Sequence, residues 1–231
     1  MLSRLPAILV ASDGHHAVHA PPGVDAGVLV RDTDLAALVH RANSDCPPQA
    51  VDIDSVAGLG SDDYAVDFVT GRLAVPIILT RRPQLAARAA ERGQIGLLHV
   101  FAYDSTGLHR SLEGHPLSAG VGSVVTPGLV ILHLRDDELA AIPRPILAYG
   151  LIDSVADARA CLEVADAIVV RPGLAAKLAA QQVEVDTRRP HGLEPGPDVS
   201  SGSSLRWCWA RCGPSSPACL ARRTSCSGSS P

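Results

Sequence analysis

Eight short apolar segments recur along this chain at a nearly regular spacing, and they constrain the fold more than any other feature. Each is rich in Val, Ile and Leu and only four to six residues long, which is typical of a buried strand. The segments lie at residues 7–12, 27–31, 50–54, 75–80, 96–101, 123–126, 146–149 and 167–170. Eight strands that alternate with helices predict an α/β fold, a compact (β/α)8 barrel of the TIM type. The repeats span about 180 residues against the usual ~250, so the loops must be short; a doubly wound open sheet is the alternative.

Helical segments follow all but the first of these strands. Thr33 and Ser61 are the predicted N-caps of two helices, because their side chains can accept a hydrogen bond from the first turn. Pro83 suits a first helical turn and Gly93 a helix end. The predicted helices cover residues 33–41, 61–69, 83–92, 105–112, 131–141, 153–163 and 174–182. Residues 13–24, with three His and two Pro, are predicted to form a loop in place of the first helix.

The stretch VDIDSVAGLGSDDYAVDF, residues 51–68, is predicted to form a strand, a glycine loop and a capped helix. Asp52 and Asp54 have the same parity along the strand, so we expect both carboxylates on one face at its end. There they could hold Mg²⁺ or accept hydrogen bonds from ligand hydroxyls. The alternatives are a solvated strand end, or Asp54 capping its own loop. Arg81, which follows the next strand, could pair with Asp54 or contact a phosphate; the alternative is a solvent-facing arginine.

From residue 187 the composition changes to Ser, Pro, Gly and Arg, with no helical or alternating period. We therefore assign residues 1–186 to the barrel and residues 187–231 to a low-complexity tail that is predicted to be disordered. The tail holds four of the six Cys residues, but their spacing matches no strong zinc pattern. A frameshifted or read-through C-terminus would also produce so abrupt a change.

The overall composition bears on location and partners. A formal net charge of −4 argues against strong, non-specific binding of nucleic acid. Because no run of about 18 apolar residues occurs, no membrane span is expected. The short apolar run near the N-terminus is soon followed by Asp13 and two His, which does not fit a signal peptide, so a cytoplasmic location is expected.

Four stretches of the chain resemble a known family in their order and spacing. DIDSVAGLGSDDYAVDF (52–68) is similar to the family pattern D-x-x-x-G-L-x-S-D-E-Y-A-x-x-F, and IILTR (77–81) is similar to its I-I-S-T-R. FAYDS (101–105) is similar to F-x-x-D-S, and TPG (126–128) with YGLI (149–152) to L-P-G and G-G-L-I. The chain thus resembles the glycerol-3-phosphate-responsive antiterminators, regulators of glycerol-uptake operons. The resemblance implies a compact β/α barrel that binds glycerol 3-phosphate and then acts on leader mRNA to prevent early termination.

The chain also departs from this family pattern at positions that a barrel would place near its ligand. The family often has His at Asp52, Arg near His99, Glu near Val124, a second Gly at Tyr149, and Thr-Ser at Val170 and Arg171. These departures leave the predicted fold unchanged and concern the residues that would contact the ligand. His99 itself falls in mid-strand, where a core or lumen histidine is expected.

Barrel sites lie at the carboxyl ends of strands, with phosphate usually near the seventh and eighth strands. Here these ends supply Gly128, Gly150, Arg171 and Gly173. Glycine lets a phosphate approach the backbone, and Arg171 would add a bidentate cation. We therefore expect glycerol 3-phosphate to bind at this rim. The alternative is that the glycines only form tight turns and that Arg171 is a surface residue.

Arg88 and Arg92 are the candidate RNA contacts. They lie four residues apart in a predicted helix and so share one of its faces. The alternative is an ordinary solvated face of a barrel helix.

We predict a glycerol 3-phosphate-sensing regulator of glycerol metabolism that acts on leader mRNA as a transcription antiterminator. Lys177, the single lysine, falls in the last helix, and no G-x-S-x-G or H-E-x-x-H motif occurs. We therefore expect no catalytic residue, no cofactor and no resident metal. One alternative is a metal-assisted phosphoester hydrolase or lyase that uses Asp52 and Asp54. Another is a degenerate homologue with neither activity, and assembly into a homo-oligomer stays open.

Overall fold

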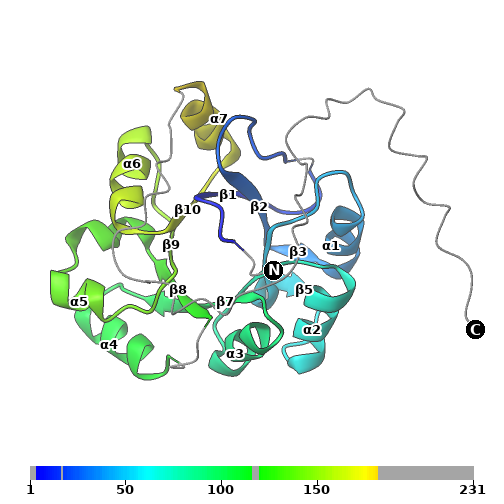
Figure 1. The fold of residues 1–231 in the computed structure, drawn as a ribbon, viewed down its shortest axis with the longest axis horizontal. Helices are drawn as coiled ribbons and strands as arrows, with labels where there is room; N and C mark the ends of the chain where they lie inside the picture. The colour runs from blue at the N-terminus through cyan, green and yellow to red at the C-terminus, as the bar shows by residue number, and fades with distance from the viewer. Residues whose placement is uncertain (1–3, 17, 116–119, 182–231) are drawn as a thin grey trace, which may run out of the picture. The chain divides into compact units, whose positions relative to one another are not determined.

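A computed structural model describes residues 4–16, 18–115 and 120–181 of the chain. Its barrel strands are β1 (Ile8–Ser12), β2 (Ala26–Val30), β4 (Ala50–Asp52), β6 (Ile77–Thr80), β7 (Ile95–Phe101), β8 (Val121–Thr126), β9 (Ile146–Tyr149) and β10 (Ala167–Val170). Over the described residues these eight parallel strands close in the order β1-β10-β9-β8-β7-β6-β4-β2 (Figure 1). The predicted (β/α)8 barrel is thus confirmed, and an open sheet is excluded because β1 pairs with both β2 and β10. The predicted tail, residues 187–231, lies outside the described residues.

Helices surround the barrel, as the alternating repeat predicts (Figure 1). They are α1 (Leu35–Ala42), α2 (Asp63–Asp67), α3 (Pro83–Glu91), α4 (Ser105–Glu113), α5 (Asp136–Ala140), α6 (Val155–Val164) and α7 (Pro172–Ala180). Two 3₁₀ segments, η1 (Ile53–Ser55) and η3 (Gly128–His133), and a π-helical turn, η2 (Phe68–Arg72), complete the helical elements of the described chain. None of the described helices has the length and apolar character needed to cross a membrane.

Two predicted N-cap residues are wrong by one position. Asp34 rather than Thr33 caps α1, and its carboxylate accepts a hydrogen bond from the Ala37 N–H. Asp62 rather than Ser61 caps α2, and it accepts from the Ala65 N–H. An aspartate in this position satisfies a free N–H group and also places a negative charge at the positive end of the helix dipole.

Pairing in a small sheet explains why α1 begins after Thr33. Thr33 is paired with Val56 in a two-stranded sheet made of β3 (Thr33–Asp34) and β5 (Val56–Ala57), so the first helix begins after it. The helix predicted over residues 131–141 is wrong in its first half, because η3 occupies that part and α5 begins only at Asp136. Three acidic residues fill the first turn of α5, where the helix dipole favours them.

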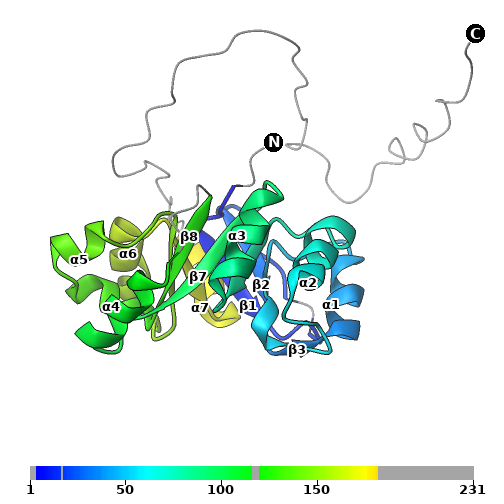
Figure 2. The ribbon, with the colours of Figure 1, turned by 90° about the horizontal axis from the view of Figure 1, so that it is seen from below.

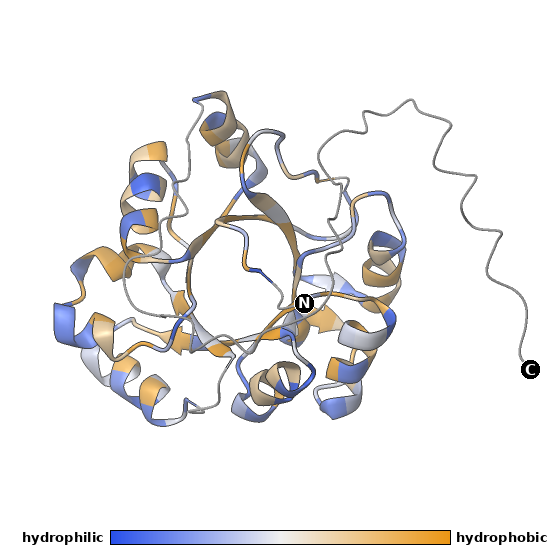
Figure 3. Ribbon diagram, viewed as in Figure 1, coloured by the Kyte–Doolittle hydropathy of each residue, from blue (hydrophilic) through white to orange (hydrophobic). Residues whose placement is uncertain are grey.

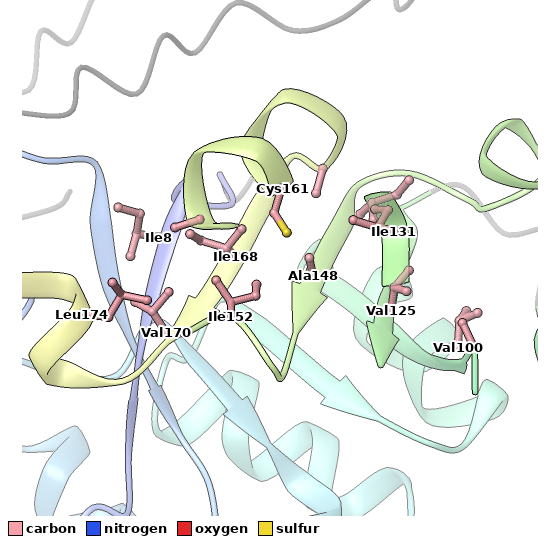
Figure 4. Close-up of a cluster of buried hydrophobic side chains, with 14 of the residues drawn as sticks. Ile8, Val100, Val125, Ile131, Ala148, Ile152, Cys161, Ile168, Val170 and Leu174 are labelled. Carbon is pink, nitrogen blue, oxygen red and sulfur yellow. The ribbon is translucent and has the colours of Figure 1, made fainter. Parts of the chain in front are cut away.

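Side chains along the strands alternate between the lumen and the helices, as a period of two requires. The lumen is filled by Leu9, Leu29, Ala50, Ile77, Leu79, Leu97, Val124, Leu147, Ala167 and Val169. The opposite faces pack against the helices, and Figure 4 shows part of this outer layer. In Figure 3 the strands are predominantly hydrophobic, and hydrophilic bands occur on the surrounding helices. Since burying a side chain of this kind contributes about 1.5–3 kcal/mol, the lumen is a packed core.

All eight strands are parallel, so their carboxyl ends meet at one mouth of the barrel. The strands β3 and β5 follow the ends of β2 and β4 and therefore mark this side. In Figure 2, which views the barrel from the side, β3 lies at the lower edge. Because apolar side chains fill the lumen of the described barrel, a ligand site is expected at the mouth and its rim.

Candidate functional site

A ring of polar side chains occupies the inward-facing positions at the mouth of the barrel. Each lies two residues beyond a lumen residue, at the end of the same strand or directly after it, so the period of two directs it toward the mouth. In the described chain these residues are Arg31, Asp52, Arg81, His99, Thr126, Tyr149 and Arg171. The apolar lumen therefore ends in a polar cup at the carboxyl ends of the strands, where the sites of β/α barrels lie.

Four of these residues form a compact group, which we name the mouth cluster: Arg31, Asp52, His99 and Tyr149. His99 Nε2 lies 4.0 Å from Asp52 Oδ2, and the ring centroids of His99 and Tyr149 are 6.3 Å apart. The guanidinium carbon of Arg31 lies 4.9 Å from the centroid of the Tyr149 ring, a cation–π contact. The four residues come from four different strand ends, so closure of the barrel brings them together.

Several buried polar atoms of the cup have no hydrogen-bond partner within the described chain. They are Arg31 Nε, Asp52 Oδ1, His99 Nδ1, Thr126 Oγ1 and the Tyr149 hydroxyl. An unpaired buried polar group costs about 1–3 kcal/mol, so folded chains rarely gather several at one place. Their convergence at the mouth indicates a site whose ligand supplies the missing partners.

Burial sets the charge state of the mouth cluster. It raises the pKa of Asp52 to about 6, with a further contribution from the negative charge of Asp54. Burial likewise lowers the pKa of His99 to about 4, and the charges of Arg81 and Arg31 act in the same direction. At neutral pH Asp52 is therefore mostly ionised and His99 is neutral, so their 4.0 Å approach is not an ion pair. The cluster then presents one anionic acceptor, one cationic donor and two groups that can donate or accept.

Asp54 has a structural role that the strand pattern did not predict. β4 ends at Asp52, so Asp54 lies in η1 and not on the same strand face. Its carboxylate is only 5% exposed and accepts hydrogen bonds from the Thr80 hydroxyl, at 3.0 Å, and from the Arg81 backbone N–H. The predicted pairing with Arg81 is confirmed, with Arg81 Nε at 3.5 Å, and Arg82 Nε lies at 3.7 Å. Asp54 thus organises the loop between β6 and α3 rather than its own loop.

The predicted phosphate rim divides into two parts. The Gly128 N–H donates to the Gly150 carbonyl at 3.0 Å, and a Cβ on Gly128 would lie 2.4 Å from the Tyr149 nitrogen. Gly128 is therefore a glycine because the turn after β8 packs on β9, and its N–H is not free for a phosphate. Gly150 (φ +91°), Gly173 in the first turn of α7, and Arg171 remain at the ends of β9 and β10. Arg171 is exposed and pairs with Asp153 at 2.7 Å, and ligand binding at this rim stays a prediction.

Most departures from the family pattern meet at the mouth, as expected for ligand-side positions. Asp52, His99 and Tyr149 belong to the mouth cluster, and Val124 lies below them in the lumen. Val170 does not belong with them, because it faces outward and packs beside Leu174 of α7 (Figure 4). The prediction that position 170 lies on the ligand side is therefore wrong. The preceding residue, Val169, points into the lumen, so Val170 points to the opposite face of the strand.

A cleft of about 450 Å³ opens beside the mouth cluster. It is lined by Ala11, Ser12, Asp13, His16, Val18, Arg31, Asp32 and Pro172. Arg31 lines the cleft and also covers the Tyr149 ring, so this side chain joins the cleft to the cup. Sequence reasoning missed Arg31, although its position two residues beyond an inward leucine was a signal that could have identified it.

Arg88 and Arg92 share one face of α3, as predicted, but their charges are matched by acidic neighbours. Arg88 donates from Nε and Nη2 to the two carboxylate oxygens of Asp67, at 3.1 and 3.0 Å. Arg92 pairs with the same carboxylate, and Arg88 also pairs with Glu91 at 3.3 Å. The hydrogen bond from Arg88 is the main reason that the pKa of Asp67 is lowered. RNA binding by this pair stays a prediction.

The described residues contain no group of three or more His, Cys, Asp or Glu side chains that could hold a metal ion. Asp52 and Asp54, which the hydrolase alternative needs as ligands, lie in different elements, and both Asp54 oxygens face Thr80 or arginine groups. The described residues thus supply no direct support for the hydrolase alternative.

A packed β/α barrel with unpaired polar groups at its mouth is the architecture of a small-molecule-binding barrel. Residues 24–181 match the sequence model of the family described as Glycerol-3-phosphate responsive antiterminator. The chain belongs to this family. The match covers more than half of the sequence and includes the mouth cluster.

Two solved structures share the fold. One is a glycerol uptake operon antiterminator-related protein from Thermotoga maritima MSB8, with 24% identity, 75% of this chain and 99% of that chain covered, and a TM-score of 0.60. The other is a glycerol uptake operon antiterminator regulatory protein from Listeria monocytogenes, with 17% identity, 71% and 90% coverage, and a TM-score of 0.56. At these identities the likeness shows the fold. No curated protein matches the chain.

Proposed function

We propose that this protein senses glycerol 3-phosphate at the mouth of its barrel and regulates glycerol metabolism as a transcription antiterminator that acts on leader mRNA. Membership of the family supports the class of ligand and the mode of regulation. The observation that supports a binding site at this position is the convergence of unpaired buried polar atoms in the cup.

The chemistry of these atoms suits a polyol. Asp52 Oδ1 can only accept a hydrogen bond from a ligand, whereas Arg31 Nε can only donate one. His99 Nδ1 and the Tyr149 hydroxyl can do either. A hydroxyl group donates and accepts at once, so adjacent hydroxyls of glycerol 3-phosphate can satisfy both kinds of group.

The phosphate should lie away from Asp52, because the ionised carboxylate repels it. The ends of β9 and β10 offer Gly150, the start of α7 and the Arg171 guanidinium. Among the described residues, the Arg171 guanidinium is paired with the exposed Asp153, which a phosphate could displace. This placement agrees with the usual position of phosphate near the seventh and eighth strands of such barrels.

Isothermal titration calorimetry tests the proposal with glycerol 3-phosphate, glycerol and inorganic phosphate as separate ligands. The parent should bind glycerol 3-phosphate more tightly than either fragment. Arg31→Ala should weaken binding through the hydroxyl end, and Arg171→Ala through the phosphate end. Arg110→Ala, on the outer surface of α4, is the matched control and should bind as the parent does. Absence of binding by the parent would refute the sensor proposal.

A further inference from the structure

The large hydrophobic side chains that the described chain leaves exposed all lie around the barrel mouth. Tyr64 is 83% exposed, Tyr103 69% and Leu151 64%. They follow the ends of β4, β7 and β9 respectively, so they share the carboxyl side of the barrel. The chain has only three tyrosines, and two of them are on this rim. Exposed aromatic residues on the side of the barrel that carries the mouth cluster are candidates for contacts with a partner.

Two arginines lie between the two exposed tyrosines. β6 is the neighbour of both β4 and β7 in the barrel, and Arg81 and Arg82 follow it directly. Asp54 lies within ion-pair distance of both guanidinium groups, and Arg82 Nη1 also donates to the Ser61 carbonyl at 3.3 Å. Both side chains are nevertheless about half exposed. We name Tyr64, Arg81, Arg82 and Tyr103 the stacking rim.

A column of aromatic rings connects the stacking rim to the mouth cluster. His99, Phe101 and Tyr103 alternate along β7 and its extension, so they project to the same side. The rings of His99 and Phe101 are 5.8 Å apart and inclined by 14°. Those of Phe101 and Tyr103 are 6.1 Å apart and inclined by 13°. A ligand that reorients His99 therefore has a packed route to the exposed ring of Tyr103.

We propose that the stacking rim binds unpaired bases of single-stranded RNA, and that the aromatic column couples this binding to the ligand in the mouth. Aromatic faces and arginine planes are the groups on which proteins stack unpaired bases. The rim is favoured over the α3 face because Arg88 and Arg92 are already paired with Asp67 and Glu91. The inference rests on the proposed function for the identity of the ligand and for RNA as the partner.

The charges around the rim predict how this binding depends on salt. Asp54 offsets part of the charge of Arg81 and Arg82, and the carboxylates of Asp62 and Asp104 are nearby N-caps. At most two phosphate contacts are therefore expected, which gives a slope of about −1.4 in a plot of log affinity against log salt, at about −0.7 per contact. A protein that binds RNA through a basic groove would have a much steeper slope.

The experiment starts from RNA selected on the parent protein, with glycerol 3-phosphate present, from a single-stranded pool of random sequence. Fluorescence anisotropy then measures the affinity of the variants. Tyr64→Ala and Tyr103→Ala should each weaken binding by about 5-fold to 100-fold, as expected for loss of one stacked base. Tyr103→Phe should keep most of the affinity, and the control Arg110→Ala should keep all of it. Tyr64→Ala should bind glycerol 3-phosphate as the parent does.

The coupling between RNA binding and glycerol 3-phosphate binding is tested separately. Glycerol 3-phosphate should change the affinity for RNA by the same factor by which RNA changes the affinity for glycerol 3-phosphate. Phe101→Leu, which interrupts the column, should bring that factor toward one while each partner still binds alone. A factor that Phe101→Leu leaves unchanged would refute the role of the column.

Other results would overturn the assignment of the rim. Failure to enrich any RNA, or RNA binding that both tyrosine variants retain, would refute it, whatever calorimetry shows for glycerol 3-phosphate. Loss of RNA binding only in the double variant Arg88→Ala, Arg92→Ala would place the interface on α3. A dimer in sedimentation that the tyrosine variants abolish, without any effect on RNA, would make the rim a contact between copies of this chain.

Discussion

Replacing Asp52 by Asn should make the protein more stable at neutral pH while it weakens ligand binding at the mouth. In the fold, burial raises the pKa of Asp52 to about 6 from an ordinary value of 3.8. Since one pKa unit corresponds to about 1.36 kcal/mol, the ionised carboxylate lowers the free energy of unfolding by about 3 kcal/mol. Asparagine has nearly the same shape and no charge, so Asp52→Asn removes this cost. Ligand binding should weaken because the anionic acceptor is lost.

The same pKa difference determines how the effect depends on pH. Below about pH 4 Asp52 is protonated in both the folded and the unfolded state and does not affect stability. Between about pH 4 and pH 6 the unfolded state loses its proton first, so the free energy of unfolding falls as the pH rises. Above about pH 6 the destabilisation by the ionised Asp52 carboxylate is complete and no longer changes with pH. The pKa of His99 is lowered to about 4 from an ordinary value of 6.5, so His99 destabilises the fold as the pH falls below 6.5. Because the parent and Asp52→Asn both contain His99, its contribution cancels in the difference between their free energies of unfolding.

Urea unfolding of the parent and of Asp52→Asn, at neutral pH and at about pH 4, measures both effects. A gain of about 3 kcal/mol should also raise the melting temperature by about 6–12 °C in a domain of this size. Asp137→Asn removes an exposed carboxylate from α5 and, as the control, should change stability by less than about 0.5 kcal/mol. If Asp52→Asn were less stable than the parent at neutral pH, or if the difference were independent of pH, the Asp52 charge would be compensated in the fold and the reasoning would fail.

Three further predictions concern neighbouring parts of the mouth. Asp54→Ala should lower the free energy of unfolding by about 1.5–3 kcal/mol, because the Thr80 hydroxyl and the Arg81 N–H in the β6–α3 loop lose their charged acceptor; a loss in urea unfolding no larger than that of Asp137→Ala would contradict this role. Gly128→Ala should destabilise the fold by about 1–3 kcal/mol or more, since its Cβ meets the Tyr149 backbone, whereas Gly173→Ala has open space; equal thermal melting of the two variants would show that the turn after β8 can adjust. With Mg²⁺ and glycerol 3-phosphate, the purified protein should release no more phosphate than Asp52→Asn does, and turnover lost in that variant would favour the hydrolase alternative.

The order of elements and the location of the site could be predicted from the sequence. Apolar runs such as residues 146–149 and 167–170 identify strands because their composition and length reflect burial on both faces. Parity along a strand is also local information, so the inward direction of His99 and of Asp52 could be worked out residue by residue. Resemblance of the motif at residues 52–68 led to the family that the sequence-model match over residues 24–181 confirms.

Tertiary structure decided which polar side chains meet and which charges are already matched. Arg31 and Tyr149 are far apart in sequence, and only closure of the barrel stacks one over the other. No local pattern shows that Asp67 pairs with both Arg88 and Arg92, because the partners come from different helical segments. Asp54 accepts a hydrogen bond from Thr80, 26 residues later in the chain, and so stabilises the loop that follows it. Periodicity along a chain determines the face on which a side chain lies, whereas its hydrogen-bond partner depends on the register and closure of the sheet, and these are properties of the whole barrel.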